Sequence, residues 1–359
     1  MRIGLVVPGF SANAEDWCIP ALRHLARALS VADDVRVVAV RYPYRPGRYS
    51  VEGADVLAVG GADRRGVAAF EVWRRTLDVL RAEHRRRPFD VLHAFWATES
   101  GLLTAIAGRL LRIPTLVSLA GGELVSLPAI GYGDQRVAWE RLKVATTLRL
   151  ATAVTAGSLQ LRGLAEKHTR KDRLHCAPLG VPLDMFRPCV THVDESRFLH
   201  VGTLTPVKDH VTLLRAFASL PVGGHLDIVG DGPLRASLEL LAKHLGIATA
   251  VTFHGDVDHA ALPDVYPLAA TFVVSSLHEA QSMVALEAAA CGLRVAGTCV
   301  GVIPELTDAV APTGDARALA TAMTSCPENR APGISRTKFG LDGCAQRFRD
   351  LYGCIANDF

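Results

Sequence analysis

Short apolar runs of strand length alternate with longer helical segments along most of this chain. In the first half, strand-like runs at 2–7, 35–40 and 91–95 are separated by segments such as 67–84, where apolar residues recur every three or four positions. A strand, a helix and a strand in that order form a right-handed crossover and build a parallel sheet. The alternation therefore predicts an α/β fold with parallel sheets.

The alternation occurs twice. Residues 176–188 carry three prolines in thirteen positions and no helical period, so they resemble a linker. After them the pattern restarts, with strands expected at 198–201, 225–229 and 251–253. A chain of 359 residues is also long for one core and comfortable for two. We expect two doubly wound, Rossmann-like domains, 1–182 and 183–341, with ligand in a cleft between them.

Composition excludes several classes of protein. The chain is 49% hydrophobic and 21% charged, which is typical of a folded globular protein, and its net charge of +3 is too small to indicate nucleic-acid binding. Its apolar runs are shorter than the roughly 20 residues of a membrane span. The N-terminus is predicted to be a strand, with no secretory signal, and the eight cysteines show no CxxC pair. We therefore expect a cytoplasmic protein whose membrane contact, if any, is peripheral.

The stretch 275–304 is the strongest candidate for a binding site. A buried strand ends near Ser275, and a helix follows the turn at 277–282. A helix that begins at the carboxyl edge of a sheet attracts anions such as phosphate. Glu279 and Glu287, eight residues apart, are able to bond the hydroxyls of a sugar and a ribose, so a nucleoside diphosphate sugar fits. The alternative is that both glutamates are solvated residues on a helix face.

The segment HEAQSMVALEAAACGLRVAGTCVGVIPEL, at 278–306, resembles the donor-site signature of the retaining GT-B glycosyltransferases of family four, the glycosyl transferases group 1. The resemblance implies a GT-B fold, in which two Rossmann-like domains face each other across a cleft and the last helix, within 342–359, packs back on the first domain. The family's usual Gly-Phe-Gly is Ala280, Gln281 and Ser282 here, and its usual proline is Arg294. These replacements keep the backbone N–H groups.

Further motifs extend the resemblance through the second domain. VGTLTPVKD resembles the family's VGRLxxxKG, which assigns Lys208 to the donor diphosphate but leaves Thr203 where the arginine is usual. The segment GDGP, which contains Gly230, resembles a turn that lies beneath the nucleotide in the family. The segment FHGDVD resembles the family's base-binding segment and so places His254 and Gly255 beside the nucleotide base. The Asp-Val-Asp of that segment is also a candidate metal site, but we disfavour a metal there. The implied donor-binding residues are Gly202, Thr203, Lys208, Gly230, His254, Gly255, Glu279, Ala280, Gln281, Ser282, Met283, Val284 and Glu287.

The acceptor side is expected at strand ends of the first domain. His93, Trp96 and Glu99 are expected after one strand, and Gly121, Gly122 and Glu123 after the next. The family's sugar-contacting histidine is Ala120 here, so Glu123 is a candidate replacement. Each of these residues is otherwise an ordinary polar loop residue. The predicted acceptor-binding residues are Asn13, Asp16, Trp17, Trp96, Gly121 and Gly122.

The resemblance implies a hexosyltransferase-type enzyme of class EC 2.4. It would move a sugar from a nucleoside diphosphate sugar, with a UDP-sugar favoured, to a hydroxyl of a small molecule, glycan or lipid carrier. The transfer would retain the anomeric configuration and would need no metal or other cofactor. The candidate catalytic residues are Lys208, Glu279, Glu123 and His93. The alternatives are a GT-B epimerase that acts on the nucleotide sugar and a catalytically silent GT-B subunit that binds a partner protein.

Arginines crowd one region of the first domain. A solvated helix face is one interpretation, and contact with an anionic membrane or a phosphorylated carrier is the other. High alanine and arginine usage also suggests a bacterial source. The arginines are Arg64, Arg65, Arg74, Arg75, Arg81, Arg85, Arg86 and Arg87.

Overall fold

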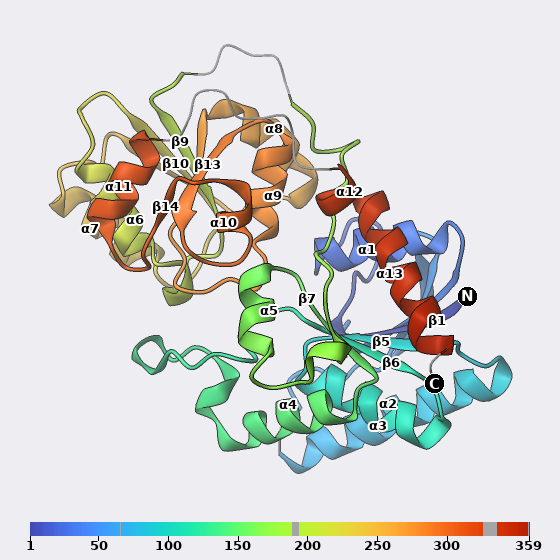
Figure 1. Cartoon of the computed structure of the whole chain (residues 1–359). Helices are drawn as coiled ribbons and strands as arrows, with labels where there is room; N and C mark the ends of the chain where they lie inside the picture. The colour runs from blue at the N-terminus through green and yellow to red at the C-terminus, as the bar shows by residue number, and fades with distance from the viewer. Residues whose placement is uncertain (65, 189–193, 326–335, 358) are drawn as a thin grey trace. The chain divides into compact units, whose positions relative to one another are not determined.

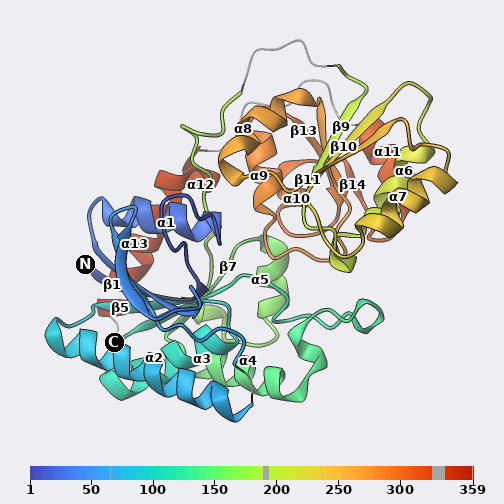
Figure 2. The same ribbon diagram turned by 180° about the vertical axis from the view of Figure 1, so that it is seen from behind.

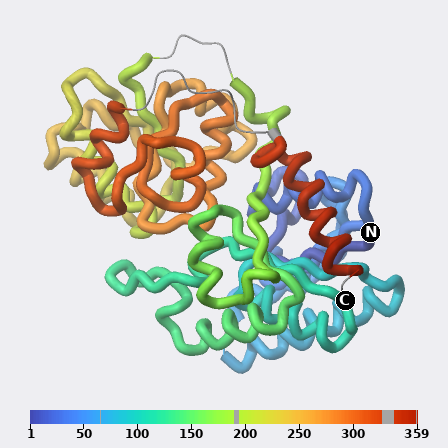
Figure 3. The backbone as a smooth tube through the Cα atoms, in the orientation of Figure 1, coloured from blue at the N-terminus to red at the C-terminus, as the bar shows by residue number. Residues whose placement is uncertain are grey.

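The computed structural model describes residues 1–64, 66–188, 194–325, 336–357 and 359 (Figure 1). Arg65 lies outside the described residues. The chain separates into two compact units, which we call unit 1 (Met1–Gly180 with Leu341–Phe359) and unit 2 (Val181–Gly340). Figure 3 traces the backbone from unit 1 into unit 2 and back into unit 1 at its last helix.

Unit 1 is built on one large sheet. Within the described chain it has eight strands in the order β3-β4-β2-β1-β5-β6-β7-β8; β3 is antiparallel to β4, and the other pairs are parallel. Helices α2, α3 and α4 cover one face, and α1 and α13 lie on the other (Figures 1 and 2). The elements are β1 Arg2–Gly9, α1 Pro20–Ser30, β2 Asp34–Tyr42, β3 Gly47–Val51, β4 Ala54–Ala58, α2 Val67–Arg86, β5 Val91–Phe95, α3 Glu99–Leu111, β6 Thr115–Leu119, α4 Ala138–Leu150, β7 Ala153–Ala156, α5 Leu159–Ala165, β8 Leu174–Cys176 and α13 Leu341–Asn357.

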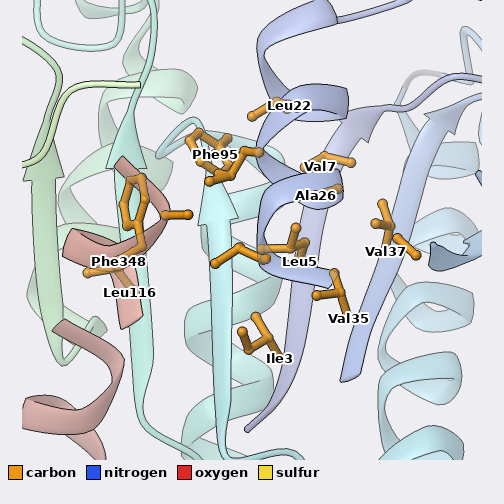
Figure 4. Close-up of a cluster of buried hydrophobic side chains, with 14 of the residues drawn as sticks. Ile3, Leu5, Val7, Leu22, Ala26, Val35, Val37, Phe95, Leu116 and Phe348 are labelled. Atoms are coloured by element: carbon orange, nitrogen blue, oxygen red, sulfur yellow. The ribbon is translucent and has the colours of Figure 1, made fainter. Parts of the chain in front are cut away.

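The core under α1 and α13 joins distant parts of the chain. On α1, Leu22 and Ala26 lie four residues apart and face the sheet, as the helical period requires. Phe348 of α13 packs among the same side chains as Leu5 of β1 and Phe95 of β5 (Figure 4). The C-terminal helix is therefore part of the unit 1 core.

Unit 2 repeats the same plan. Its described strands form a six-stranded parallel sheet in the order β11-β10-β9-β12-β13-β14, which is the order of a Rossmann fold. One core cluster lies under α6, α7 and α11 and another under α8, α9 and α10, so the sheet is covered on both faces. The elements are β9 Arg197–Val201, α6 His210–Ala218, β10 His225–Val229, α7 Arg235–His244, β11 Val251–Gly255, α8 Leu262–Val265, β12 Thr271–Val274, α9 Met283–Ala290, β13 Arg294–Thr298, α10 Ile303–Leu306, β14 Val310–Ala311, α11 Ala316–Thr324 and α12 Arg336–Phe339.

Several elements were absent from the sequence prediction: the strands β3, β8 and β14 and the helices α4, α8, α10, α11 and α12. Two of them show why. β3 is a short edge strand whose residues are mostly exposed, so it lacks the apolar run that marks the buried strands. In α4, Val144 and Leu148 are buried while Trp139 and Leu142 are exposed, so its apolar residues form no single stripe.

Candidate functional site

The turn between β12 and α9 forms the centre of the predicted donor site. β12 ends at Val274, Ser276 is buried after it, and α9 begins at Met283. The amide of Leu286 donates to the carbonyl of Ser282 at 3.4 Å, so the N–H groups earlier in α9 have no acceptor within the helix. This end of α9 presents backbone donors and the positive end of the helix dipole.

Ser282 sits at the tip of this turn in a strained conformation. Its φ is 77°, in the left-handed region where glycine is favoured, and its buried hydroxyl has no hydrogen-bond partner among the described residues. Ala280 and Gln281 are also buried. A Cβ on Gly301 would lie 2.6 Å from the Gln281 carbonyl oxygen, which accepts the amide of Val302 at 2.9 Å. The loop after β13 thus supports the turn.

Lys208 and Glu279 form an ion pair beside this turn. Lys208 Nζ lies 2.6 Å from Glu279 Oε1, and the Ser276 hydroxyl donates to the same oxygen at 2.7 Å. Burial opposes the ionisation of Glu279, but Lys208 and Ser276 outweigh it and hold the pKa of that carboxyl below its usual value. The Ser275 hydroxyl donates to the Lys208 carbonyl at 2.7 Å. The structure therefore brings the predicted cation and the first predicted carboxylate together.

Two glycines let backbone segments approach each other next to Lys208. Gly230 has a φ of 123°, and a Cβ on it would lie 2.3 Å from the Gly202 carbonyl oxygen. A Cβ on Gly202 would lie 3.6 Å from Lys208 Cε. Thr203 follows Gly202 and is exposed. These predicted donor residues lie at the carboxyl ends of β9 and β10, at the same edge of the sheet as the α9 turn.

Glu287 is buried in α9 and held by two side chains that the sequence analysis did not identify. Tyr266 Oη donates to Glu287 Oε2 at 2.8 Å, and His259 Nε2 lies 3.0 Å from Glu287 Oε1. Phe186 packs against both rings, with centroids 5.5 Å from His259 and 5.9 Å from Tyr266. No motif marks these partners, because loop and helix segments more than twenty residues before Glu287 supply them.

The side chain of His254, on β11, contacts a carboxylate on the neighbouring strand β10. Its Nε2 lies 2.7 Å from Asp227 Oδ1, and Arg197 Nε donates to Asp227 Oδ2 at 2.8 Å. Burial opposes the ionisation of Asp227, but Arg197 and His254 keep its pKa below the usual value. Gly255, with a φ of 78°, follows at the end of β11, and the Arg235 guanidinium lies 3.2 Å from where its Cβ would be.

On unit 1, Glu123 is fully buried and links the loops after β5 and β6. Its carboxylate accepts the amides of Ala97 at 3.3 Å, Ala120 at 3.1 Å and Gly121 at 2.7 Å. Burial raises the pKa of Glu123 above its usual value, although these N–H groups oppose the rise. A Cβ on Gly121 would lie 2.8 Å from Trp96 Nε1. Glu123 therefore holds the two loops at this edge of the sheet together from the interior, and its side chain exposes no surface to a sugar in this conformation.

The loop after β1 is held by side chains that were partly predicted. Asp16 accepts the hydroxyl of Tyr42 at 2.8 Å, and Asn13 accepts the amide of Asp16 at 2.9 Å. Arg23, which the sequence analysis missed, lies 3.9 Å above the Trp17 ring and donates to the Asp16 carbonyl at 3.1 Å. The loops that follow parallel strands at this edge of unit 1 carry all the predicted acceptor residues: Asn13, Asp16, Trp17, Trp96, Gly121 and Gly122.

The predicted placement of His93 is wrong. We expected it after a strand, with Trp96 and Glu99, but it is the third residue of β5 and fully buried. Its Nδ1 lies 2.7 Å from Tyr352 Oη, and its Nε2 lies 2.8 Å from Ser118 Oγ. Burial lowers the pKa of His93 to about 3. Side chains alternate between the faces of a strand, and this one points into the core, so His93 is part of the unit 1 framework.

In the part of the chain that the structure describes, no group of three His, Cys, Asp or Glu side chains is arranged to hold a metal ion. No described helix is long and apolar enough to cross a membrane.

Comparisons with known proteins agree on one family. The sequence model described as "Glycosyl transferases group 1" matches residues 195–329, and that described as "Glycosyl transferase 4-like domain" matches residues 19–180. D-inositol 3-phosphate glycosyltransferase of Mycobacterium avium is 31% identical over 324 residues, which cover 82% of this chain and 74% of that protein. Other relatives of that name match over 51% to 60% of their own length.

Solved structures share the fold. Sucrose-phosphate synthase from Thermosynechococcus elongatus superposes with a TM-score of 0.80 at 23% identity, with both chains fully covered. Anabaena HepE in complex with UDP and glucose has a TM-score of 0.75 at 17% identity and covers 98% of this chain and 99% of its own. The predicted GT-B fold class is thereby confirmed.

Proposed function

Because this chain belongs to the group 1 glycosyl transferases, we propose that it moves a sugar from a nucleoside diphosphate sugar to an acceptor hydroxyl with retention of anomeric configuration. The family prediction is confirmed, and with it the transferase class EC 2.4. The donor we propose is a UDP-sugar. HepE, a structure of the same fold, is recorded with UDP and glucose, which supports this choice.

The ion pair of Lys208 and Glu279 beside the start of α9 is the observation that carries the proposal. It places a cation and a carboxylate next to backbone donors, which is what a pyrophosphate joined to a polyhydroxyl ring requires. Lys208 would turn from Glu279 to the diphosphate when the donor binds, and Glu279 would accept sugar hydroxyls. The hydroxyl of Ser282, buried and without a partner among the described residues, is a further group available to the phosphates.

The nucleoside would bind farther along the same edge. We assign Glu287 to the ribose hydroxyls, with Tyr266 and His259 holding its carboxylate. The backbone around Gly255 would face the base. Positive φ at Gly255 and Gly230 permits the close backbone approach that a flat ring needs.

The chemistry we propose needs no metal and no side-chain nucleophile. Lys208 and the N–H groups of Met283 and Val284 would stabilise the departing diphosphate, which is electrostatic leaving-group stabilisation. Positive charge then develops on the sugar ring as an oxocarbenium-like species. The acceptor hydroxyl attacks from the leaving-group side, forms the new C–O bond and passes its proton to the departing phosphate.

Acceptor chemistry belongs to unit 1 in this proposal. The loops that carry Asn13, Asp16, Trp96 and Gly121 lie at one edge of its sheet, where ligands of parallel α/β folds bind. The acceptor classes are a small molecule, a glycan or a lipid carrier. The relatives are named for D-inositol 3-phosphate, so that compound is a first acceptor to assay.

A panel of nucleotide sugars, incubated with the purified chain with and without D-inositol 3-phosphate and other acceptors, tests the proposal. We expect acceptor-dependent release of UDP, insensitivity to EDTA, and a product with the donor's anomeric configuration by NMR. Lys208→Ala should slow the release of UDP by roughly 10- to 150-fold, because the loss of one charge-assisted hydrogen bond to the diphosphate costs about 1.5 to 3 kcal/mol.

Other results would select the alternatives. Interconversion of the nucleotide sugar without acceptor would identify an epimerase. UDP binding with no turnover on any donor would indicate a silent subunit. An inverted product would refute retention.

A further inference from the structure

Three aromatic rings from α2 and α4 form a row on unit 1, in which the outer two, Phe70 and Trp139, are exposed and Trp73 between them is half-buried. Trp73 and Trp139 stack with centroids 6.5 Å apart and planes 7° from parallel, and Phe70 meets Trp73 edge-on at 5.2 Å. Phe70 is 56% exposed and Trp139 49%. Val67 and Leu142, also exposed, lie three residues from Phe70 and Trp139 on the same helices and extend the row. We call these five residues the aromatic face.

Such a group is unusual on this molecule. Apart from Val137, which directly precedes α4, the other exposed large apolar side chains of the described residues lie singly on different elements, as Leu110 does on α3 and Leu240 on α7. Single exposed apolar residues are normal, whereas contiguous ones mark a contact surface.

The aromatic face is joined to the edge of the sheet where we expect the acceptor. Trp73 Nε1 donates to Glu99 Oε1 at 2.5 Å, and Arg41, near the end of β2, donates to Glu99 Oε2 at 2.7 Å. Glu99 begins α3 three residues after Trp96. The face therefore continues the acceptor edge of unit 1.

The two helices that carry the face are also basic. α2 has five arginines and three acidic residues, and α4 has three basic residues and one acidic residue. Together the two helices carry a net charge of +4, whereas the net charge of the whole chain is only +3. Arg74, which forms an ion pair with Asp78, and Arg141 are both exposed on these helices. This excess of positive charge complements an anionic surface, and like-charge repulsion opposes pairing of the face with its own copy. Tryptophan with arginine is typical of surfaces that lie at the headgroup level of a bilayer.

We propose that the aromatic face binds the surface of an anionic lipid bilayer and so holds the acceptor edge of unit 1 close to membrane-borne acceptors. The lipid contact stands on these residues alone. Its role in presenting the acceptor rests on the proposed function.

Co-sedimentation with vesicles tests the contact without any donor sugar, so its failure is distinguishable from a failure of the transferase assay. We expect the full chain to sediment with phosphatidylcholine vesicles containing 30% phosphatidylglycerol and much less with phosphatidylcholine alone. Phe70→Ser with Trp139→Ser should lower the partition coefficient by about tenfold or more per ring. The double variant Arg74→Glu, Arg141→Glu should lower the partition coefficient by about fivefold for each positive charge removed.

Matched controls lie on unit 2. Leu240→Ser, at a residue 64% exposed on α7, and the exposed pair Lys243→Glu with Arg317→Glu should leave binding unchanged. Equal sedimentation at both lipid compositions, or none at either, would overturn the proposal. So would a dimer, found by light scattering without lipid, that dissociates in the Phe70→Ser, Trp139→Ser variant, because the face would then be an interface between copies.

Discussion

The carboxylate of Glu287 accepts one bond from Tyr266 and lies within hydrogen-bond distance of His259, which fixes its direction before any ligand arrives. Glu287→Ala should therefore weaken UDP binding by at least tenfold, since it removes a charged acceptor for two ribose hydroxyls. Tyr266→Phe should weaken it less, by about three- to tenfold, because the carboxylate remains but loses one bond. Titration calorimetry measures both, with the exposed Tyr44→Phe as control. Unchanged affinity in Glu287→Ala refutes the ribose assignment.

His210 presents a second residue-scale case, in which a polar ring is buried without hydrogen bonds. Both ring nitrogens lack a hydrogen-bond partner among the described residues. The centroid of the ring lies 4.7 Å from that of the His200 ring. Burial, with smaller contributions from His200 and Lys208, lowers the pKa of His210 to about 2. The folded protein therefore keeps His210 neutral while the unfolded chain takes up a proton below pH 6.5.

It follows that His210 destabilises the fold increasingly as pH falls from 6.5 toward 2, by up to about 1.4 kcal/mol per pH unit. His210→Leu should flatten the dependence of Tm on pH between 7 and 5 and stabilise the protein at pH 7 by about 1 kcal/mol, because no unsatisfied polar group remains. Thermal unfolding at several pH values measures both. His244→Leu, at an exposed residue of α7, should change neither, and an unaltered slope in His210→Leu would contradict the burial argument.

The site residues that the sequence could predict share one property: they belong to a local motif. Lys208 and Glu279 were assigned to the donor site by the resemblance of their motifs to the family's donor-site signature, and the structure joins them by an ion pair. The sequence analysis missed Tyr266 and Arg23 because their roles depend on partners that folding brings close. It misplaced His93 because a polar residue inside an apolar strand looks the same in sequence whether it faces a ligand or the core.

At the scale of elements, periodicity was a good guide wherever one face of an element is buried. Most strands of the two sheets, though not β3, β8 or β14, and the helices α1, α2, α7 and α9 appear near the predicted residues. Periodicity failed for α4 because the aromatic face places apolar side chains on its exposed side. The same residues that concealed this helix in the sequence are those that suggest its function.

The helix α13 is tied to unit 1 through the core. Phe348 is 1% exposed and packs near His93 and Phe95, with ring centroids 5.0 and 6.4 Å away. Phe348→Ala should lower the free energy of unfolding of unit 1 by about 3–5 kcal/mol. Phe359→Ala, at an exposed residue beyond the helix, should change it by less than about 0.5 kcal/mol. Urea unfolding followed by tryptophan fluorescence measures both, and equal effects would show that α13 is not part of the core.

At the scale of the whole molecule, the two units can be observed separately. The chain has four tryptophans, Trp17, Trp73, Trp96 and Trp139, and all of them belong to unit 1. The proposed donor site lies wholly in unit 2. Tryptophan fluorescence therefore reports unit 1, whereas far-UV circular dichroism reports the helices of both units.

If the units unfold independently, UDP should stabilise only unit 2. At 100 times its Kd, a ligand that binds the folded state alone adds about 2.7 kcal/mol. We expect UDP to move the part of the urea transition seen by circular dichroism to higher denaturant and to leave the fluorescence midpoint unchanged. A shift confined to fluorescence would place the nucleotide on unit 1 and contradict the donor assignment. A single transition that shifts equally by both probes would instead show that the units unfold together, because only a cooperative molecule passes the stabilisation of one unit to the other.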